Sequence, residues 1–234
     1  MKKDNWMTDF YGINWYRINN LDELEDVSDE KALIEYVVDV NSYSEIYKLQ
    51  TEGFKIVETD IEFETLINTQ YETKPNIRVA IKDDLPEILE ITKSSYLEHD
   101  KFFNRFRNED FFTKDQAWYY YRESVVNNFN LENTITVVVD DDDGVCAYYI
   151  IKKIGELSLY HRYKGIISGV NSRGKGKSLH LEMQRKITEI INTPYITNNR
   201  TQLGNYRVID NHLKENRQLS KIEHICYKKV GNWG

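Results

Sequence analysis

Hydrophobic residues recur with spacings of two and of about 3.6 residues, which predicts strands interleaved with helices. The order is clearest after residue 76. Strands are expected over 77–81, 134–139, 145–153, 195–199 and 223–229, and residues 157–163 and 166–170 form either one long bent strand or two. Helices are expected after a cap at 83–86 and over 116–128, 178–191 and 205–215. This order predicts an α/β domain.

The first third of the chain is patterned less clearly. Residues 11–18 and 54–57 are expected to be strands, 43–52 a helix closed by Gly53, and 29–40 either a helix or a strand. The polar segment 69–76 carries one of only three prolines and separates these elements from the later ones. We therefore expect two domains, a small α/β domain over 1–70 and a larger domain over 77–234.

The acidic run 140–143 lies with Gly144 between two expected strands, a pattern that predicts a β-hairpin. The run lacks the spacing and the distal glutamate of an EF-hand, so a solvated turn is favoured over a calcium site. The five histidines show no pair at metal-binding spacing. No metal is expected.

The segment 169–178, GVNSRGKGKS, joins an expected strand to an expected helix and combines glycines with three cations. Backbone N–H groups in such a turn converge on an anion, and the helix N-terminus adds partial positive charge. The segment therefore predicts a phosphate or diphosphate site. It misses the P-loop pattern by one residue in both registers, and no Rossmann glycine pattern occurs.

The residues at 173–178 match the pattern R-x-x-G-x-[G/A/S] and resemble the diphosphate loop of the GCN5-related N-acetyltransferases (GNAT), with serine at the last position in place of the usual glycine or alanine. The resemblance implies coenzyme A as the ligand. It also implies a mixed, mostly antiparallel twisted sheet, split near its fourth strand, whose exposed amides polarise a thioester carbonyl. The implied cofactor-binding residues are Ser168, Val170, Arg173, Gly174, Lys175, Gly176, Lys177, Ser178 and Asn205.

Two residues of the helix expected at 205–215 are candidates for catalysis. In the GNAT family an asparagine at the start of this helix lines the pantetheine arm, and Asn205 matches it. His212 lies seven residues later, so both side chains share one helix face. Family members carry a tyrosine at the position of His212, where it protonates the departing thiolate. His212 is the expected proton donor. The alternatives are that it accepts the proton of the amine as a base, or that it is a surface histidine.

Four further stretches, 10–14, 49–58, 102–107 and 201–205, carry a resemblance over the whole chain. It is to the TDP-fucosamine acetyltransferases and related nucleotide-sugar N-acyltransferases of surface-polysaccharide synthesis, including O-antigen and capsule. This implies transfer of an acetyl or short hydroxyacyl group, such as 3-hydroxybutyryl, to the amine of a dTDP-linked amino sugar. Phe102, Arg105 and Arg107 are the expected sugar-nucleotide contacts, with an arginine fork on the diphosphate. Packing of an amphipathic segment is the alternative. Another amine acceptor (a peptide N-terminus, a polyamine or an antibiotic) and a non-catalytic CoA-binding module also remain open.

The formal net charge of −7 argues against a nucleic-acid partner, because phosphate neutralisation needs a basic face. No apolar run approaches the length of a membrane span and the N-terminus has no signal-peptide pattern, so no membrane partner is expected. The two distant cysteines favour a reduced, cytoplasmic protein. The expected partners are small molecules, and self-association into a homodimer stays open.

Overall fold

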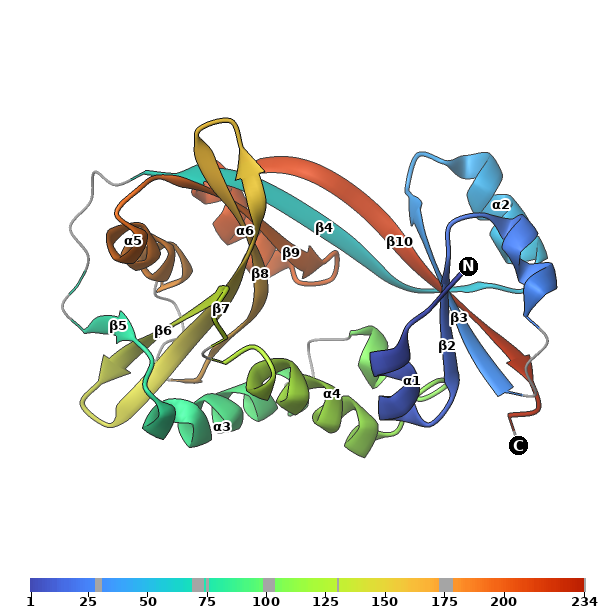
Figure 1. Cartoon of the computed structure of the whole chain (residues 1–234), viewed down its shortest axis with the longest axis horizontal. Coiled ribbons are helices and arrows are strands. Elements are labelled where there is room, and N and C mark those ends of the chain that lie inside the picture. The colour runs from blue at the N-terminus through green and yellow to red at the C-terminus, as the bar shows by residue number, and fades with distance from the viewer. Residues whose placement is uncertain are drawn as a thin grey trace. The chain divides into compact units, whose positions relative to one another are not determined.

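In the computed structural model, the chain divides into two compact units, unit 1 (Met1–Ile61 with Lys221–Gly234) and unit 2 (Glu62–Ser220) (Figure 1). The structure describes residues 1–27, 31–68, 74, 76–98, 104–129, 131–172 and 179–233, with the side chain of residue 26 left out. Two long strands, β4 (Lys55–Ile67) and β10 (Gln218–Gly231), run through both units.

Unit 1 is a small sheet with helices. Its other elements are β1 (Lys2–Lys3), α1 (Asn5–Tyr11), β2 (Asn14–Ile18), η1 (Leu21–Asp26), β3 (Lys31–Asp39) and α2 (Tyr43–Thr51). The strand order is β1-β2-β3-β10, with β2 parallel to β3 and the other pairs antiparallel. A buried core that includes Ile34, Tyr36, Leu49 and Phe54 joins α2 to this sheet.

Two expectations for unit 1 change in the structure. Residues 31–39, which the sequence left between helix and strand, form strand β3. The strand expected over 11–18 begins only at Asn14, because helix α1 precedes it. The Asp4 side chain caps this helix by accepting from the N–H of Met7, and Gly12 ends it in the left-handed conformation at φ 65°.

Unit 2 has the element order that the sequence predicts. Its elements besides the shared strands are β5 (Ile77–Val79), η2 (Lys82–Asp84), α3 (Leu85–Tyr96), η3 (Arg105–Arg107), α4 (Lys114–Val126), β6 (Thr134–Asp141), β7 (Gly144–Leu157), β8 (Tyr160–Val170), α5 (Leu179–Ile191), β9 (Tyr195–Gln202) and α6 (Tyr206–Lys214). The strand order is β4-β9-β8-β7-β6-β5. The pairs from β5 to β8 are antiparallel, whereas β8 and β9 are parallel. The mixed, mostly antiparallel sheet confirms the expected fold class.

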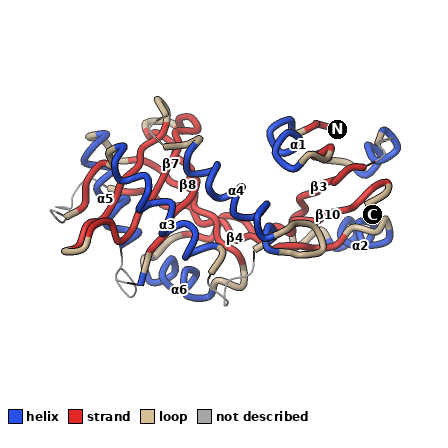
Figure 2. Tube along the Cα trace, turned by 90° about the horizontal axis from the view of Figure 1, so that it is seen from below, coloured by secondary structure: helices blue, strands red, loops and turns tan. Residues whose placement is uncertain are grey.

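Helices cover both faces of the unit 2 sheet. The faces are separated at Tyr148 and Tyr149, since successive residues of a strand point to opposite sides. The hydroxyl of Tyr148 lies 2.7 Å from that of Thr92 on α3, whereas the Tyr149 ring packs against α5 at His180. Figure 2 shows α3 and α4 lying together across the sheet. The α5 face holds a buried hydrophobic core, with Met183 among its fully buried residues.

The domain division differs from the expected 1–70 and 77–234 at the end of the chain. From Glu223 to Gly231, β10 pairs with β3 in an antiparallel register, so the last strand belongs to unit 1. The sequence pattern predicts the strand but cannot show its partner, because the paired residues lie between 184 (Glu223 and Asp39) and 200 (Gly231 and Lys31) positions apart in the chain.

Candidate functional site

A split between β8 and β9 opens the centre of the unit 2 sheet. Their parallel pairing runs from His161 opposite Tyr195 to Lys164 opposite Asn198, and ends there within these fully described strands. In β8 the register against β7 also shifts, which leaves Ile166 as the extra residue of a bulge. A bulge bends its strand, so the two strands diverge beyond this point. The strand left open as one or two is the single bent strand β8, which begins at Tyr160 because Leu157 still belongs to β7. The split lies near the fourth strand, as the expected fold requires.

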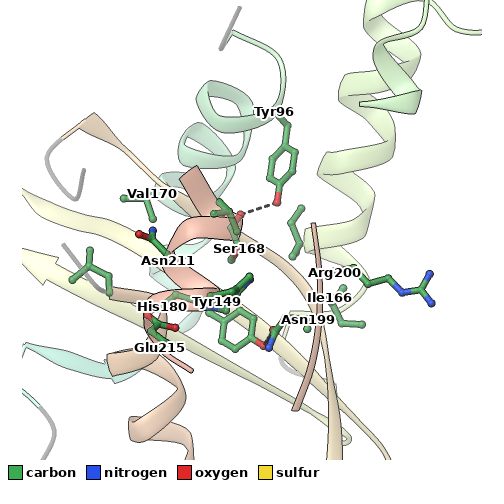
Figure 3. Close-up of a pocket in the computed structure, with 15 residues that line it drawn as sticks. Tyr96, Tyr149, Ile166, Ser168, Val170, His180, Asn199, Arg200, Asn211 and Glu215 are labelled. Carbon is green, nitrogen blue, oxygen red and sulfur yellow. Dashed lines mark hydrogen bonds between the residues drawn. The ribbon is translucent and has the colours of Figure 1, made fainter. Parts of the chain in front are cut away.

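A pocket of about 200 Å³ lies at this split. Figure 3 shows the side chains around it. The lining residues come from both diverging strands and from the helices on either side: Tyr96, Tyr149, Gly165, Ile166, Ile167, Ser168, Val170, Leu179, His180, Asn199, Arg200, Val208, Asn211, His212 and Glu215. The pocket therefore combines a strand edge with several polar side chains.

The backbone of Ser168 and Val170 faces the split. The N–H of Asn171 donates to the Cys146 carbonyl of β7 at 3.0 Å, and the backbone groups of successive strand residues point to opposite edges. Ser168 and Val170 therefore direct theirs away from β7. The hydroxyl of Tyr96 confirms this direction, because it donates to the Ser168 carbonyl at 2.8 Å (Figure 3). Both predicted residues line the pocket.

Part of the pocket wall is a buried chain of hydrogen bonds. The hydroxyl of Tyr149 donates to Oδ1 of Asn199 at 2.6 Å, and Nε2 of Gln184 lies 3.4 Å from the same hydroxyl. Burial raises the pKa of Tyr149, so its hydroxyl stays protonated. A Cβ at Gly165 would lie only 2.7 Å from Asn199 Oδ1 and 2.9 Å from the Tyr149 hydroxyl. Glycine is therefore needed where β8 passes this pair.

His212 is a pocket residue and is only 3% exposed, so the alternative of a surface histidine is wrong. Its ring lies 4.7 Å from that of Phe63 and 5.6 Å from that of His180, between centroids. Burial, with a smaller contribution from the positive charge of Arg217, lowers the pKa of His212 to about 3. Burial likewise lowers the pKa of His180 well below its usual value. Both rings are therefore neutral at physiological pH.

Asn205 lies at the other end of α6 from His212. It is the N-cap residue of the helix, is half-buried, and is not among the residues that line the pocket. Nδ1 of His212 has no hydrogen-bond partner among the described residues, although the atom is buried. A group entering the pocket can therefore pair with His212. Contact between Asn205 and the pantetheine arm of coenzyme A stays a prediction.

The predicted sugar-nucleotide residues lie before α4. Asn104 accepts from the N–H of Phe106 at 3.1 Å, and the buried Phe106 ring stacks on Tyr120 at 3.7 Å. The guanidinium of Arg105 lies 4.8 Å from the centre of the Phe106 ring. Arg105 and Arg107 are half-buried, and neither lines the pocket. Phe102 lies outside the described residues.

The predicted diphosphate loop, 173–178, also lies outside the described residues. The elements on either side of it are placed: β8 ends at Val170 and α5 begins at Leu179, and both of these residues line the pocket. The described elements that flank the motif in the sequence therefore both reach the pocket.

Sequence reasoning missed several pocket residues. Tyr96, Tyr149, Asn199 and Glu215 belong to no motif, and only the placing of β8 beside β9 brings them together. Glu215 alone carried a local signal, because it follows His212 by three residues and so shares its helix face.

No group of side chains that could hold a metal ion occurs among the described residues. Within the same part of the chain, the helices are too short or too polar to cross a membrane. The described lining of the pocket offers hydroxyl, amide, imidazole, guanidinium and carboxylate side chains beside the strand edge.

No protein-family model and no curated protein matches the chain. Solved structures do match. A functionally unknown conserved protein from Staphylococcus epidermidis matches with a TM-score of 0.57 at 10% identity, over 92% of this chain and 84% of that one. A GCN5-related N-acetyltransferase from Sphaerobacter thermophilus matches with a TM-score of 0.51 at 11% identity, over 90% and 65%. The chain has the GNAT fold.

A third match is an N-myristoyltransferase of Saccharomyces cerevisiae with bound myristoyl-CoA and inhibitors, with a TM-score of 0.52 at 10% identity, over 86% of this chain and 53% of that one. The chain thus spans 65% of the GCN5-related enzyme and about half of the myristoyltransferase. At these identities the matches establish a shared fold, and the split pocket lies within it.

Proposed function

We propose that this chain is an acyl-CoA-dependent N-acyltransferase whose acceptor is the amine of a dTDP-linked amino sugar. One observation carries the proposal: a strand edge and a neutral, buried imidazole face the same pocket at the split between β8 and β9. The GNAT fold of the chain and the N-acetyltransferase and acyl-CoA ligand named for its structural neighbours support the same chemistry.

The edge of β8 suits the pantetheine arm of acyl-CoA. The arm contains two amide groups, which can pair with backbone groups as another strand would. Val170 directs its backbone to that edge, and Ser168 does so two residues earlier. The predicted loop 173–178 follows Val170 closely in the sequence and would hold the diphosphate of the same molecule.

His212 suits the departing sulfur. As a neutral imidazole it has one N–H donor and one acceptor nitrogen. A buried ring with an unpaired nitrogen gains most from a partner in the pocket. We assign His212 to the transfer of a proton to the thiolate of CoA, in the place that a tyrosine takes in the GNAT enzymes that this sequence resembles.

The acceptor and the acyl chain rest on the sequence resemblance. Arg105 and Arg107 would contact the sugar nucleotide, together with Phe102. That resemblance gives an acetyl group or a short hydroxyacyl group as the acyl chain. Synthesis of a surface polysaccharide is the setting that this acceptor implies.

A thiol-release assay tests the proposal. Purified protein is incubated with acetyl-CoA and with each of three amine classes: dTDP-amino sugars, polyamines and peptide N-termini. Release that requires a dTDP-amino sugar supports the proposal. Release with a polyamine or peptide alone would change the acceptor class, and CoA binding without any release would identify a non-catalytic module.

A further inference from the structure

We infer that Glu215 is the general base that removes the proton from the incoming amine, and that the buried Arg217 is the positioning residue that holds its carboxylate. The inference rests on the proposed acyl transfer and assigns a role in it that no sequence motif indicates. Glu215 is the C-cap residue of α6, and it forms an ion pair with Arg217 there.

The carboxylate of Glu215 is held through one oxygen. Nε of Arg217 donates to Oε2 at 2.7 Å, and Nη2 lies 2.5 Å from the same atom. The Arg217 side chain is 0% exposed and that of Glu215 is 11% exposed, so both are fixed in place. Among the described residues, Oε1 of Glu215 has no hydrogen-bond partner. One oxygen therefore stays available to a proton donor in the pocket.

Glu215 lies on the same side of α6 as His212, three residues further along, and both line the pocket. The other titratable or charged groups that face this pocket are Tyr96 from α3, Tyr149 from β7, His180 from α5 and Arg200 from β9. The pKa of Tyr96 is raised to about 12 by burial, and Arg200 is paired with Glu62 at 2.8 Å. Glu215 supplies the one carboxylate in the described lining.

The reaction needs such a base because an alkyl amine arrives as an ammonium ion, which has no lone pair for attack. Glu215 takes one proton and the nitrogen attacks the thioester carbonyl, forming a C–N bond. The C–S bond then breaks, and the nitrogen's second proton reaches sulfur through the two ring nitrogens of His212. The products are the amide, CoA thiol and the proton that Glu215 releases to water.

The pH dependence of Glu215→Gln separates a base from a structural residue. At pH 7, kcat/KM for a dTDP-amino sugar should fall about 10²-fold, with an unchanged KM for acetyl-CoA. The deficit should shrink about tenfold per pH unit up to the amine's own pKa, because free amine then forms in solution and needs no base. A deficit that is independent of pH, or no deficit, would overturn the inference.

Matched variants keep the test decisive. Glu182→Gln breaks a comparable pair, with Arg185 at 3.0 Å on α5 and outside the pocket, and should behave as wild type at every pH. In Glu215→Gln the buried charge of Arg217 loses its partner, which could prevent folding. The double variant Glu215→Gln with Arg217→Met removes both charges and should show the same pH-dependent deficit. Arg217→Met alone should lower kcat, and its deficit should lack the tenfold decrease per pH unit expected of Glu215→Gln, since the base is still present.

The outcomes also separate this inference from the proposed function. Wild-type thiol release together with a pH-independent ratio between Glu215→Gln and wild type would overturn only the role of Glu215. No thiol release from wild-type protein with any amine would overturn both.

Discussion

The hydroxyl of Tyr149 donates a 2.6 Å hydrogen bond to Oδ1 of Asn199, which joins β7 to β9 directly beside the backbone of Gly165 on β8. The bond lies at the point where β8 and β9 cease to pair. It therefore replaces backbone pairing as the connection between strands on the two sides of the split.

Gly165→Ala should destabilise the protein, because the new Cβ would lie 2.7 Å from Asn199 Oδ1 and 2.9 Å from the Tyr149 hydroxyl. Crowding of this kind costs about 1–3 kcal/mol in the free energy of unfolding, which urea denaturation measures. Gly204→Ala is the matched control, since no atom lies within 4 Å of its Cβ position. Equal stability of the two variants would show that the pair at Tyr149 can move aside at little cost.

Stability should decrease on acidification through His212. Its pKa is 6.5 in the unfolded chain and about 3 in the folded one. Between these values the unfolded chain takes up a proton and the folded protein does not, so the free energy of unfolding falls as the pH decreases. The decrease is at most about 1.4 kcal/mol per pH unit for this one group.

His212→Gln removes this titration. Urea denaturation at pH 6.5 and pH 4.5 should therefore show a smaller loss of stability in the variant than in wild type. Part of the loss should remain, because the pKa of His180 is also lowered. Equal losses in the two proteins would mean that His212 is more hydrated than its 3% exposure indicates.

Replacement of His212 should affect chemistry more than binding. His212→Ala should lower kcat about 10²-fold with little change in the KM for acyl-CoA, because the proton transfer occurs only after the substrates are bound. His212→Tyr should recover part of the rate, since a hydroxyl can also donate. Steady-state kinetics with each variant makes the comparison, and a wild-type kcat in His212→Ala would remove His212 from the mechanism.

Binding of the sugar nucleotide can be tested without the acyl donor. TDP should raise the Tm of the protein by a few degrees, since a ligand that binds only the folded state stabilises it. The shift should be reduced in Arg105→Ala or Arg107→Ala. Stabilisation by a polyamine but not by TDP would contradict this acceptor.

Much of unit 2 follows from local patterns in the sequence. The alternation of apolar and polar residues on either side of the acidic turn predicts the β6–β7 hairpin. In the structure this hairpin runs from Thr134 to Leu157. Apolar spacing predicts α5 and α6 to within one residue at each end. These signals are carried by neighbouring residues, so no tertiary information is needed to read them.

The pocket could not be predicted to the same depth. Its walls depend on the register of β8 against β7 and β9, and on the bulge at Ile166, which are long-range features. The pairing of Arg217 with Glu215 depends on how the chain turns after α6. His212 was found because helical spacing from Asn205 is a local signal, whereas its burial against Phe63 is not.

Calorimetric titration with acetyl-CoA tests the central claim most directly. Wild-type protein should bind acetyl-CoA, and Gly176→Val should lose this affinity while keeping its Tm, because a β-branched side chain would enter the path of the diphosphate. Gly204→Ala should bind as wild type does. Absence of binding to wild-type protein, or unchanged affinity in Gly176→Val, would contradict the account.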